Sequence, residues 1–287
     1  MAKNAQYKRY TRSTAGSVGY FTLLILASVF MVFPLFYCVI TSFKPLDELL
    51  IFPPKFIVER PTFSNYRALP DLLSNLNIPI SRYAFNTILI TIFTTAGSVI
   101  IGSMAAFAFS KSKQKSAKVC FFVVQTMMLY NAATLAVPQY LIFSKLHLVD
   151  TYWVYILPHL ANTVHCFLMK QFMDASVNQA LLEAARIDGA DVFTIYWRII
   201  MPIMKPAVMT VLLFSFQAMW SVVPGGTIFS EELKTLPYVM SSVAAGGVAR
   251  TGSSMAITVI LMIPPILVFL VTQSNVLETM SNSGIKE

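Results

Sequence analysis

Long apolar runs, separated by shorter polar segments, follow one another along the chain. Six of them have roughly the length of a bilayer crossing, which takes about 20 apolar residues in a helix. Charged side chains are almost absent within these runs. The predicted spans are residues 18–42, 84–110, 119–137, 152–172, 206–223 and 256–271. The pattern predicts an all-α membrane protein with six transmembrane helices and one transmembrane domain, residues 18–274.

Composition supports the membrane class. The chain is 56% hydrophobic and only 12% charged, whereas soluble domains carry about 25% charged residues. The net charge of +8 does not indicate nucleic-acid binding, because the basic residues form short runs beside the apolar segments instead of one basic face. We therefore expect a lipid bilayer, and no nucleic acid, among the partners.

The basic residues predict the orientation of the spans. Thirteen of the 21 Lys and Arg residues lie on the cytoplasmic side if the N-terminus is inside. The strongest cluster is Lys111, Lys113, Lys115 and Lys118, in a short loop where the positive-inside bias is most reliable. The first apolar run is longer than the core of a cleaved signal peptide. We expect an uncleaved first span and cytoplasmic tails at residues 1–17 and 275–287.

A polar, helix-forming segment separates the fourth and fifth predicted spans. Residues 178–187 are rich in strong helix formers, and Asn178 or Ser176 can cap them by accepting from backbone N–H groups. Gly189 suits the left-handed residue that ends a helix. Asp191 then caps a second helix that extends to about residue 200. The sequence predicts a helix–turn–helix at one membrane surface.

The same segment resembles the signature loop of ABC-importer permeases. Glu183, Ala184 and Ala185 are followed after three residues by Gly189, and the pattern ends at Ile199 and Met201-Pro202, where Met201 replaces the usual leucine. The resemblance implies a cytoplasmic coupling helix seated in a cleft of the ATP-hydrolysing subunit. The matching positions are Glu183 and Gly189, with contact or packing residues Ala184, Ala185 and Asp188. An ordinary amphipathic surface helix is the alternative.

Further motifs resemble carbohydrate-importer permeases of the maltose type. They are Thr41–Pro45, Phe63–Tyr66, Phe85–Thr87, Pro138–Tyr140, Leu148–Tyr152 and Leu157-Pro158. Asn178 departs from the family pattern, which often has proline there, and Trp220 is followed by Ser221 where asparagine is frequent. The resemblance implies a second, homologous permease subunit, two ATP-binding subunits, an extracytoplasmic solute-binding protein, and a sugar or oligosaccharide substrate. It also implies the cytoplasmic membrane of a bacterium or archaeon.

The candidate functional side chains suit solute binding and not catalysis. The sequence has no Gly-x-x-x-x-Gly-Lys-[Ser/Thr] phosphate loop, so we expect no catalytic residue and no cofactor here, with ATP and Mg²⁺ bound by the partner ATPase. Its three Cys and three His residues show no metal-ligand spacing. Amide and aromatic side chains at membrane depth suit sugar hydroxyls and ring faces. The cavity candidates are Tyr130, Asn131, Gln217 and Trp220, for which helix packing or an interfacial aromatic belt is the alternative.

Other functions remain open at this stage. An ABC permease for a different solute is the nearest alternative, although the spans lack a charge that would compensate a charged solute. A secondary transporter usually places carboxylates at the midplane, and an intramembrane enzyme needs a catalytic constellation; the spans contain neither. A purely structural subunit leaves the helix–turn–helix unexplained. The sequence leaves open which sugar is carried and which permease subunit binds it.

Overall fold

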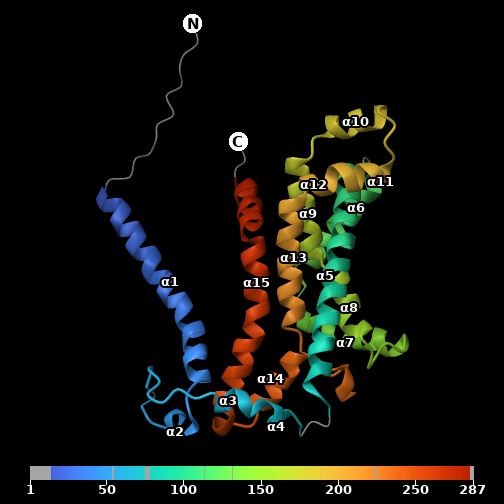
Figure 1. Cartoon of the computed structure of the whole chain (residues 1–287). Coiled ribbons are helices and arrows are strands. Elements are labelled where there is room, and N and C mark those ends of the chain that lie inside the picture. The colour runs from blue at the N-terminus through green and yellow to red at the C-terminus, as the bar shows by residue number, and fades with distance from the viewer. Residues whose placement is uncertain are drawn as a thin grey trace. The chain divides into compact units, whose positions relative to one another are not determined.

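The computed structural model describes residues 14–53, 55–74, 78–112, 114–130, 132–223 and 225–284. Within these ranges the chain forms helices and no strand (Figure 1). Three helices are long and apolar enough to cross a membrane: Gly16–Ser42, Ile80–Lys111 and Thr251–Leu277. A bent pair, Val192–Ile203 and Lys205–Trp220, is a fourth candidate. The prediction of an all-α membrane protein is therefore confirmed.

The chain divides into two compact units. The first combines the residues up to Ala68 with Gly247–Val259, and the second combines Leu69–Gly246 with the residues from Ile260 onward. Helices of the first unit are α1 (Thr14–Ser42), α2 (Leu46–Leu49), α3 (Ser64–Arg67) and η3 (Val248–Arg250). Helix α15 (Thr251–Gly284) begins in the first unit and continues into the second.

In the first unit, Asn65 connects two motifs that are distant in sequence. Its side-chain amide donates hydrogen bonds of 2.8 Å to the backbone carbonyls of Ser42 and Lys44. The hydroxyl groups of Ser42 and Tyr66 lie 2.8 Å apart. A Cβ on Gly252 would come within 2.4 Å of the Asn65 side-chain oxygen, so a larger residue in this first turn of α15 would displace the Asn65 side chain. The Thr41–Pro45 and Phe63–Tyr66 motifs thus form one hydrogen-bonded structure.

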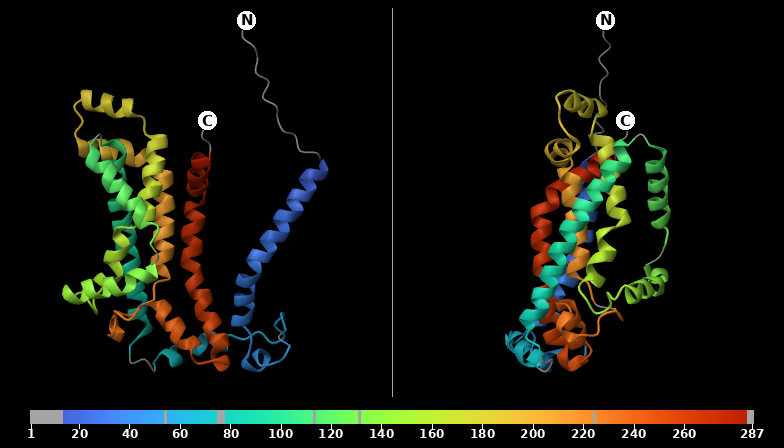
Figure 2. Two further views of the ribbon diagram at one scale, coloured as in Figure 1. Left: turned by 180° about the vertical axis from the view of Figure 1, so that it is seen from behind. Right: turned by 90° about the vertical axis from the view of Figure 1, so that its right-hand side faces the viewer.

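The second unit is built around α5 (Ile80–Lys111), which packs along α8 (Trp153–Leu160), α9 (Thr163–Ser176) and α13 (Lys205–Trp220). The remaining helices are α4 (Leu69–Ser74), α6 (Lys115–Met127), α7 (Ala132–Lys145), α10 (Gln179–Ile187), α11 (Val192–Thr194), η1 (Ile195–Ile200), α12 (Met201–Ile203), η2 (Glu231–Leu233) and α14 (Leu236–Ala244). Figure 2 shows α10 and α11 at one end of the α5–α9–α13 bundle and α14 at the other.

Helix α5 carries a row of hydroxyl side chains on its buried face. Thr87, Thr91, Thr94, Thr95, Ser98 and Ser103 are all at least nine-tenths buried. Ser98 Oγ lies 2.9 Å from Nδ1 of His165 on α9. An unpaired polar group in lipid costs several kcal/mol, and these side chains lie inside the protein instead, where the hydroxyls of Thr91, Thr94 and Thr95 have no hydrogen-bond partner among the described residues.

The predicted helix at 119–137 is interrupted in the structure. Helix α6 ends at Met127, and α7 begins only at Ala132. The backbone N–H groups of Met128, Leu129 and Tyr130 bond to carbonyls three residues earlier, which tightens and ends the helical turn. Hydropathy does not record this change of winding. The apolar run was therefore predicted as one helix, where the structure has two.

The predicted helix at 152–172 is likewise two helices, α8 and α9. Helix α8 ends at Leu160, and Asn162 starts α9 by accepting hydrogen bonds from the N–H groups of Val164 (3.0 Å) and His165 (3.1 Å). A break at membrane depth is tolerated where the freed backbone groups find partners in the protein. Asn162 supplies that partner as the N-cap of α9. The hydropathy pattern does not distinguish such a capping residue, so the break was not predicted.

The ends of the outer helices differ modestly from prediction. Helix α1 begins at Thr14, before the predicted start at residue 18. Helix α15 extends to Gly284, so most of the predicted tail at 275–287 is helical. The basic residues of the predicted N-terminal tail, at positions 3 to 12, lie outside the described residues.

Candidate functional site

The segment 178–204 joins α9 to α13 and contains the helix–turn–helix expected from the sequence. Asn178 Oδ1 accepts a 3.0 Å hydrogen bond from Ala180 N, and α10 follows over nine residues. Gly189 ends the turn with φ +84°, a conformation that only glycine adopts without steric cost. The predicted cap, helix and left-handed glycine all agree with the structure.

Helix α10 has a buried face and an exposed face. Leu182 is 1% exposed and Ala185 is 9% exposed, whereas Glu183 and Ala184 lie at the surface. Ile187 is 86% exposed. The two alanines of the motif therefore differ: Ala185 packs against the helices beneath, and Ala184 leaves a smooth outer surface for a partner to approach.

Glu183 presents a carboxylate on this outer surface. Among the described residues, its side chain has one hydrogen bond, from Gln179 Nε2 at 3.3 Å. Asp188 caps the end of α10 through its backbone N–H and is also exposed. The carboxylate of Glu183 has remaining lone pairs with which to accept from a basic side chain of another protein.

The second helix of the segment starts as predicted but is wound differently. Asp191 Oδ1 accepts from Thr194 N at 3.1 Å, and the hydrogen bonds from Thr194 lower the pKa of this carboxyl group. The chain continues through α11 into η1, a stretch of π-helix over Ile195–Ile200. The sequence predicted an ordinary helix to about residue 200. π-Helical winding is rare and occurs mostly as short stretches at functional sites.

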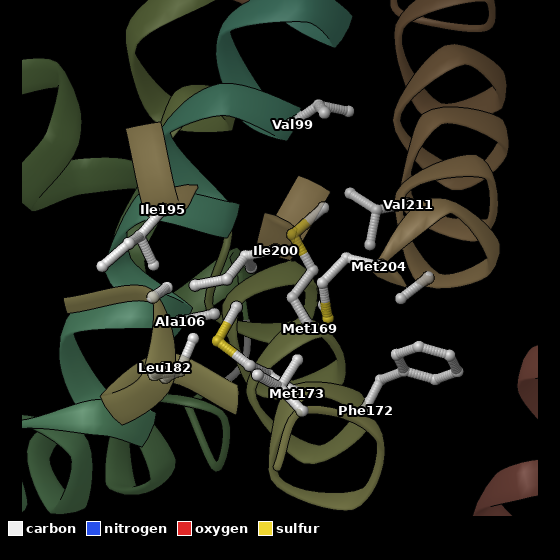
Figure 3. Packing of buried hydrophobic residues seen from close by; sticks show 13 residues of the cluster. Val99, Ala106, Met169, Phe172, Met173, Leu182, Ile195, Ile200, Met204 and Val211 are labelled. Carbon is white, nitrogen blue, oxygen red and sulfur yellow. The ribbon is translucent and has the colours of Figure 1, made fainter. Parts of the chain in front are cut away.

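A continuous apolar core fixes the segment to the transmembrane bundle. Figure 3 shows Leu182 and Ile195 of the segment packed together with Ala106 of α5 and with Met169 and Met173 of α9. This contiguous packing makes the segment part of the bundle instead of a loose loop.

Two polar contacts complete this attachment. The hydroxyl groups of Tyr196 and Ser103 lie 2.6 Å apart in a buried position. Lys111 Nζ donates to the carbonyl of Val177 at 2.8 Å, which ties the end of α5 to the start of the segment. Both contacts join α5 to the segment from opposite sides of the apolar core.

Exposed apolar side chains beside α10 were not identified from the sequence. Val192 is 61% exposed and Phe193 is 69% exposed, and they lie one turn beyond Gly189. Ile187, in the last turn of α10, is likewise exposed. The segment also contains large apolar residues that are buried in the core, so apolar character alone did not distinguish the exposed ones. Exposed apolar patches rimmed by polar residues are typical of protein interaction sites.

The segment turns sharply into α13 without losing its hydrogen bonding. The helices on the two sides of Met204 meet at 80°. Met204 N donates to the carbonyl of Ile200 at 2.8 Å, and Val208 N donates to the carbonyl of Met204 at 2.9 Å. Pro206 lies in the first turn of α13, as predicted. The bend is thus a hydrogen-bonded corner and not a flexible joint.

The substrate-cavity candidates do not form one cluster. Tyr130 follows α6 and is 61% exposed, and Gln217 is exposed on α13. Trp220, one turn beyond Gln217, donates from Nε1 to the carbonyl of Leu261 at 2.9 Å. No hydrogen bond or ring contact joins these three residues within the described part of the chain. Asn131 lies outside the described residues.

A second polar site lies at the opposite end of the bundle. Asn86 Nδ2 donates to the carbonyls of Glu232 (2.7 Å) and Lys234 (2.8 Å), and its Oδ1 accepts from Tyr152 OH at 2.8 Å. Leu236 N donates to Thr87 Oγ1 at 2.8 Å. The residue motifs 85–87 and 148–152 therefore share a function in the fold, which is to hold the connection between α13 and α14.

Asp150 fastens the same connection at a second point. Its carboxylate accepts from the backbone N–H groups of Phe229 and Ser230, each at 2.9 Å, and from the Ser230 hydroxyl. The hydrogen bonds from Ser230 lower the pKa of the Asp150 carboxyl group. The described residues 227–236 are thus held in place by side-chain contacts.

An all-helical membrane chain with a surface helix–turn–helix packed into its bundle has the architecture of a transporter's membrane subunit. Residues 98–276 match the family described as "Binding-protein-dependent transport system inner membrane component", and the chain belongs to this family. It is therefore a multi-pass membrane component of a transport system, and not the ATP-hydrolysing subunit.

Similar proteins share the full length of the chain. The arabinooligosaccharides transport system permease protein AraQ of Bacillus subtilis (strain 168) is 27% identical over 91% of this chain and 93% of that protein. The galactooligosaccharides transport system permease protein GanQ of the same organism is 25% identical over 100% of both. A chain in the crystal structure of a bacterial ABC transporter involved in the import of the acidic polysaccharide alginate has the same fold, with a TM-score of 0.76, 24% identity, and coverage of 92% of this chain and 98% of that chain.

Proposed function

We propose that the chain is one of two permease subunits of an ATP-driven importer that moves a sugar or oligosaccharide from an external binding protein into the cytoplasm. Family membership supports the transport role. The oligosaccharide relatives support the solute class. The near absence of charged residues within the predicted spans supports a neutral solute, because a charged one requires a compensating charge at membrane depth.

The observation that carries the proposal is the surface of the segment 178–204. On α10 it offers the exposed carboxylate of Glu183 and the exposed side chain of Ile187, and the other face of this helix is packed into the core through Leu182 and Ala185. Such a surface suits a groove on the ATP-hydrolysing subunit, with Glu183 pairing with a basic residue there. ATP and Mg²⁺ would be bound entirely by that partner.

The proposed topology has six crossings with both termini in the cytoplasm. The crossings are residues 18–42, 84–110, 119–137, 152–172, 206–223 and 256–271, of which the third and fourth are broken helices. The segment 178–204 lies on the cytoplasmic side, and the connection from α13 to α14 lies outside. ATP-driven closure of the ATPase pair would then push on α10 and rock the bundle between inward- and outward-facing states, as rigid-body alternating access requires.

Charge reversal at Glu183 tests the docking role. In detergent-solubilised membranes, tagged wild-type chain is expected to co-purify a second permease and an ATPase, whereas Glu183→Lys retains the permease and loses the ATPase by tenfold or more, since a buried charge pair broken at an interface costs about 2–5 kcal/mol. Glu59→Lys makes the same charge change at another exposed carboxylate and should keep the ATPase. Equal ATPase recovery with Glu183→Lys and wild type would disprove the docking role.

The solute class is tested separately with the purified importer. Proteoliposomes containing the complex, its binding protein and internal MgATP are offered neutral oligosaccharides of two to four sugars, and uptake is followed by mass spectrometry. ATP-dependent uptake of one of them supports the sugar assignment. Uptake of phosphate, an amino acid or a polyamine in place of any oligosaccharide would replace it with another solute class.

A further inference from the structure

Helix α15 contains two adjacent prolines that remove backbone donors from its interior. Pro264 and Pro265 lie within the helix, and proline has no amide N–H. The carbonyls of Ile260 and Leu261, four residues earlier, therefore lose their usual helical donors. Leu261 is 9% exposed, so water does not readily supply the missing hydrogen bond to its carbonyl.

Trp220 of α13 supplies the donor that Pro265 lacks. Its Nε1 lies 2.9 Å from the carbonyl oxygen of Leu261. The indole ring is stacked on Phe216 one turn earlier, with ring centroids 5.6 Å apart and planes inclined by 9°. The stack limits the ring's rotation and directs the N–H toward α15. An interaction between helices thus replaces a hydrogen bond within one helix.

The same α13 begins at the corner that follows the segment 178–204. The backbone hydrogen bonds from Met204 to Ile200 and from Val208 to Met204 continue through this corner, and they give a connected path by which a displacement of the segment can reach α13. Helix α13 has 16 residues, which corresponds to roughly 24 Å. Trp220 is its last residue, at the end where such a turn has its largest effect.

We propose that Trp220 is a positioning residue: it satisfies the Leu261 carbonyl left free by Pro265, and this bond transmits movement of the segment 178–204 through α13 to α15. The bond assigns Trp220 to helix coupling in place of solute contact. The transmission step rests on the proposed importer function, whereas the hydrogen bond between the two helices does not.

A double-mutant cycle tests the hydrogen bond first, with the thermal unfolding of the solubilised full chain as the readout. Trp220→Phe keeps an aromatic ring beside Phe216 and removes the donor, so the unfolding temperature should fall. Pro265→Ala restores an N–H opposite Leu261. In that background Trp220→Phe should have little further effect, because contacting sites are not additive.

Pro264→Ala is the matched control for this cycle. It restores a donor opposite Ile260 but not opposite Leu261, so Trp220→Phe should keep its full effect there. An equal fall in unfolding temperature in the wild-type, Pro264→Ala and Pro265→Ala backgrounds would overturn the assignment of Trp220 as the substitute donor, whether or not the chain assembles with an ATPase.

The transmission step is read from MgATP hydrolysis by the assembled importer. Trp220→Phe should keep the ATPase bound, since Trp220 lies at the opposite end of α13 from α10, yet lower the hydrolysis rate per assembled complex about tenfold, the effect of leaving one buried carbonyl unpaired in the closing movement. A rate equal to wild type in a fully assembled complex would overturn the transmission step and leave the proposed importer function intact. Loss of the ATPase from the variant would also overturn it.

Discussion

Gly189 occupies a backbone conformation that ordinary side chains avoid. Its φ of +84° turns the chain between α10 and α11, and a Cβ there would meet no neighbouring atom within 4 Å. The requirement for glycine is therefore conformational and not steric crowding by other residues. This position determines the angle between the surface that carries Glu183 and the one that carries Phe193.

Replacement of Gly189 by alanine should loosen this turn. An alanine in the left-handed region costs about 1–2 kcal/mol, so we expect Gly189→Ala to lower co-purification of the ATPase about tenfold while the chain remains folded. Gly226→Ala is the control, because a Cβ there also meets nothing within 4 Å and no positive φ is recorded. Similar ATPase recovery from both variants would contradict the conformational role of Gly189.

At the scale of single elements, α10 is a short helix that is held to the bundle by one of its faces. Nine residues are too few for a helix to be stable alone in water, so the helix depends on tertiary packing. Leu182 provides much of it, since it is 1% exposed within the core formed with α5 and α9. The neighbouring Leu181 is 42% exposed and lies on the outer side of the same helix.

These two leucines give a matched pair for a stability test. Leu182→Ala should destabilise the segment by about 2–5 kcal/mol, the usual cost of emptying a buried leucine site. Limited proteolysis of the solubilised chain should then cleave between residues 178 and 204 much faster than in wild type. Leu181→Ala removes the same atoms from the surface and should leave the cleavage rate nearly unchanged. Comparable cleavage of the two variants would show that α10 is not anchored through Leu182.

At the scale of the whole molecule, two of the polar networks lie at opposite ends of the second unit. The segment 178–204 occupies one end of the bundle, and the contacts of Asn86 and Asp150 hold residues 227–236 at the other (Figure 2). The proposed topology places the first end in the cytoplasm and the second outside. The helices of the bundle connect these two ends (Figure 2).

Cysteine labelling tests this topology. In a variant without Cys38, Cys120 and Cys166, Gly226→Cys should react with a membrane-impermeant maleimide added to intact cells. Ser116→Cys, in the first turn of α6 and within the Lys cluster, should react only after the cells are permeabilised. Both substituted positions are exposed in the structure. The reverse pattern would invert the proposed orientation.

The local features of the segment 178–204 were predictable from neighbouring residues alone. These features are the caps at Asn178 and Asp191, the helix over 179–187 and the left-handed Gly189. All of them depend on contacts between residues a few positions apart, so neighbouring residue types are enough to predict them. The apolar runs likewise determined the class of protein, because a bilayer requires a fixed length of apolar helix.

Tertiary structure decided what each of these residues contacts. The burial of Ala185 but not Ala184 and the bond from Trp220 to Leu261 depend on residues distant in sequence. A hydropathy pattern records whether a side chain is apolar, and it does not record which helix lies opposite. Only the packed bundle brings Trp220 to the carbonyl that Pro265 leaves without a donor, because that contact spans 41 residues.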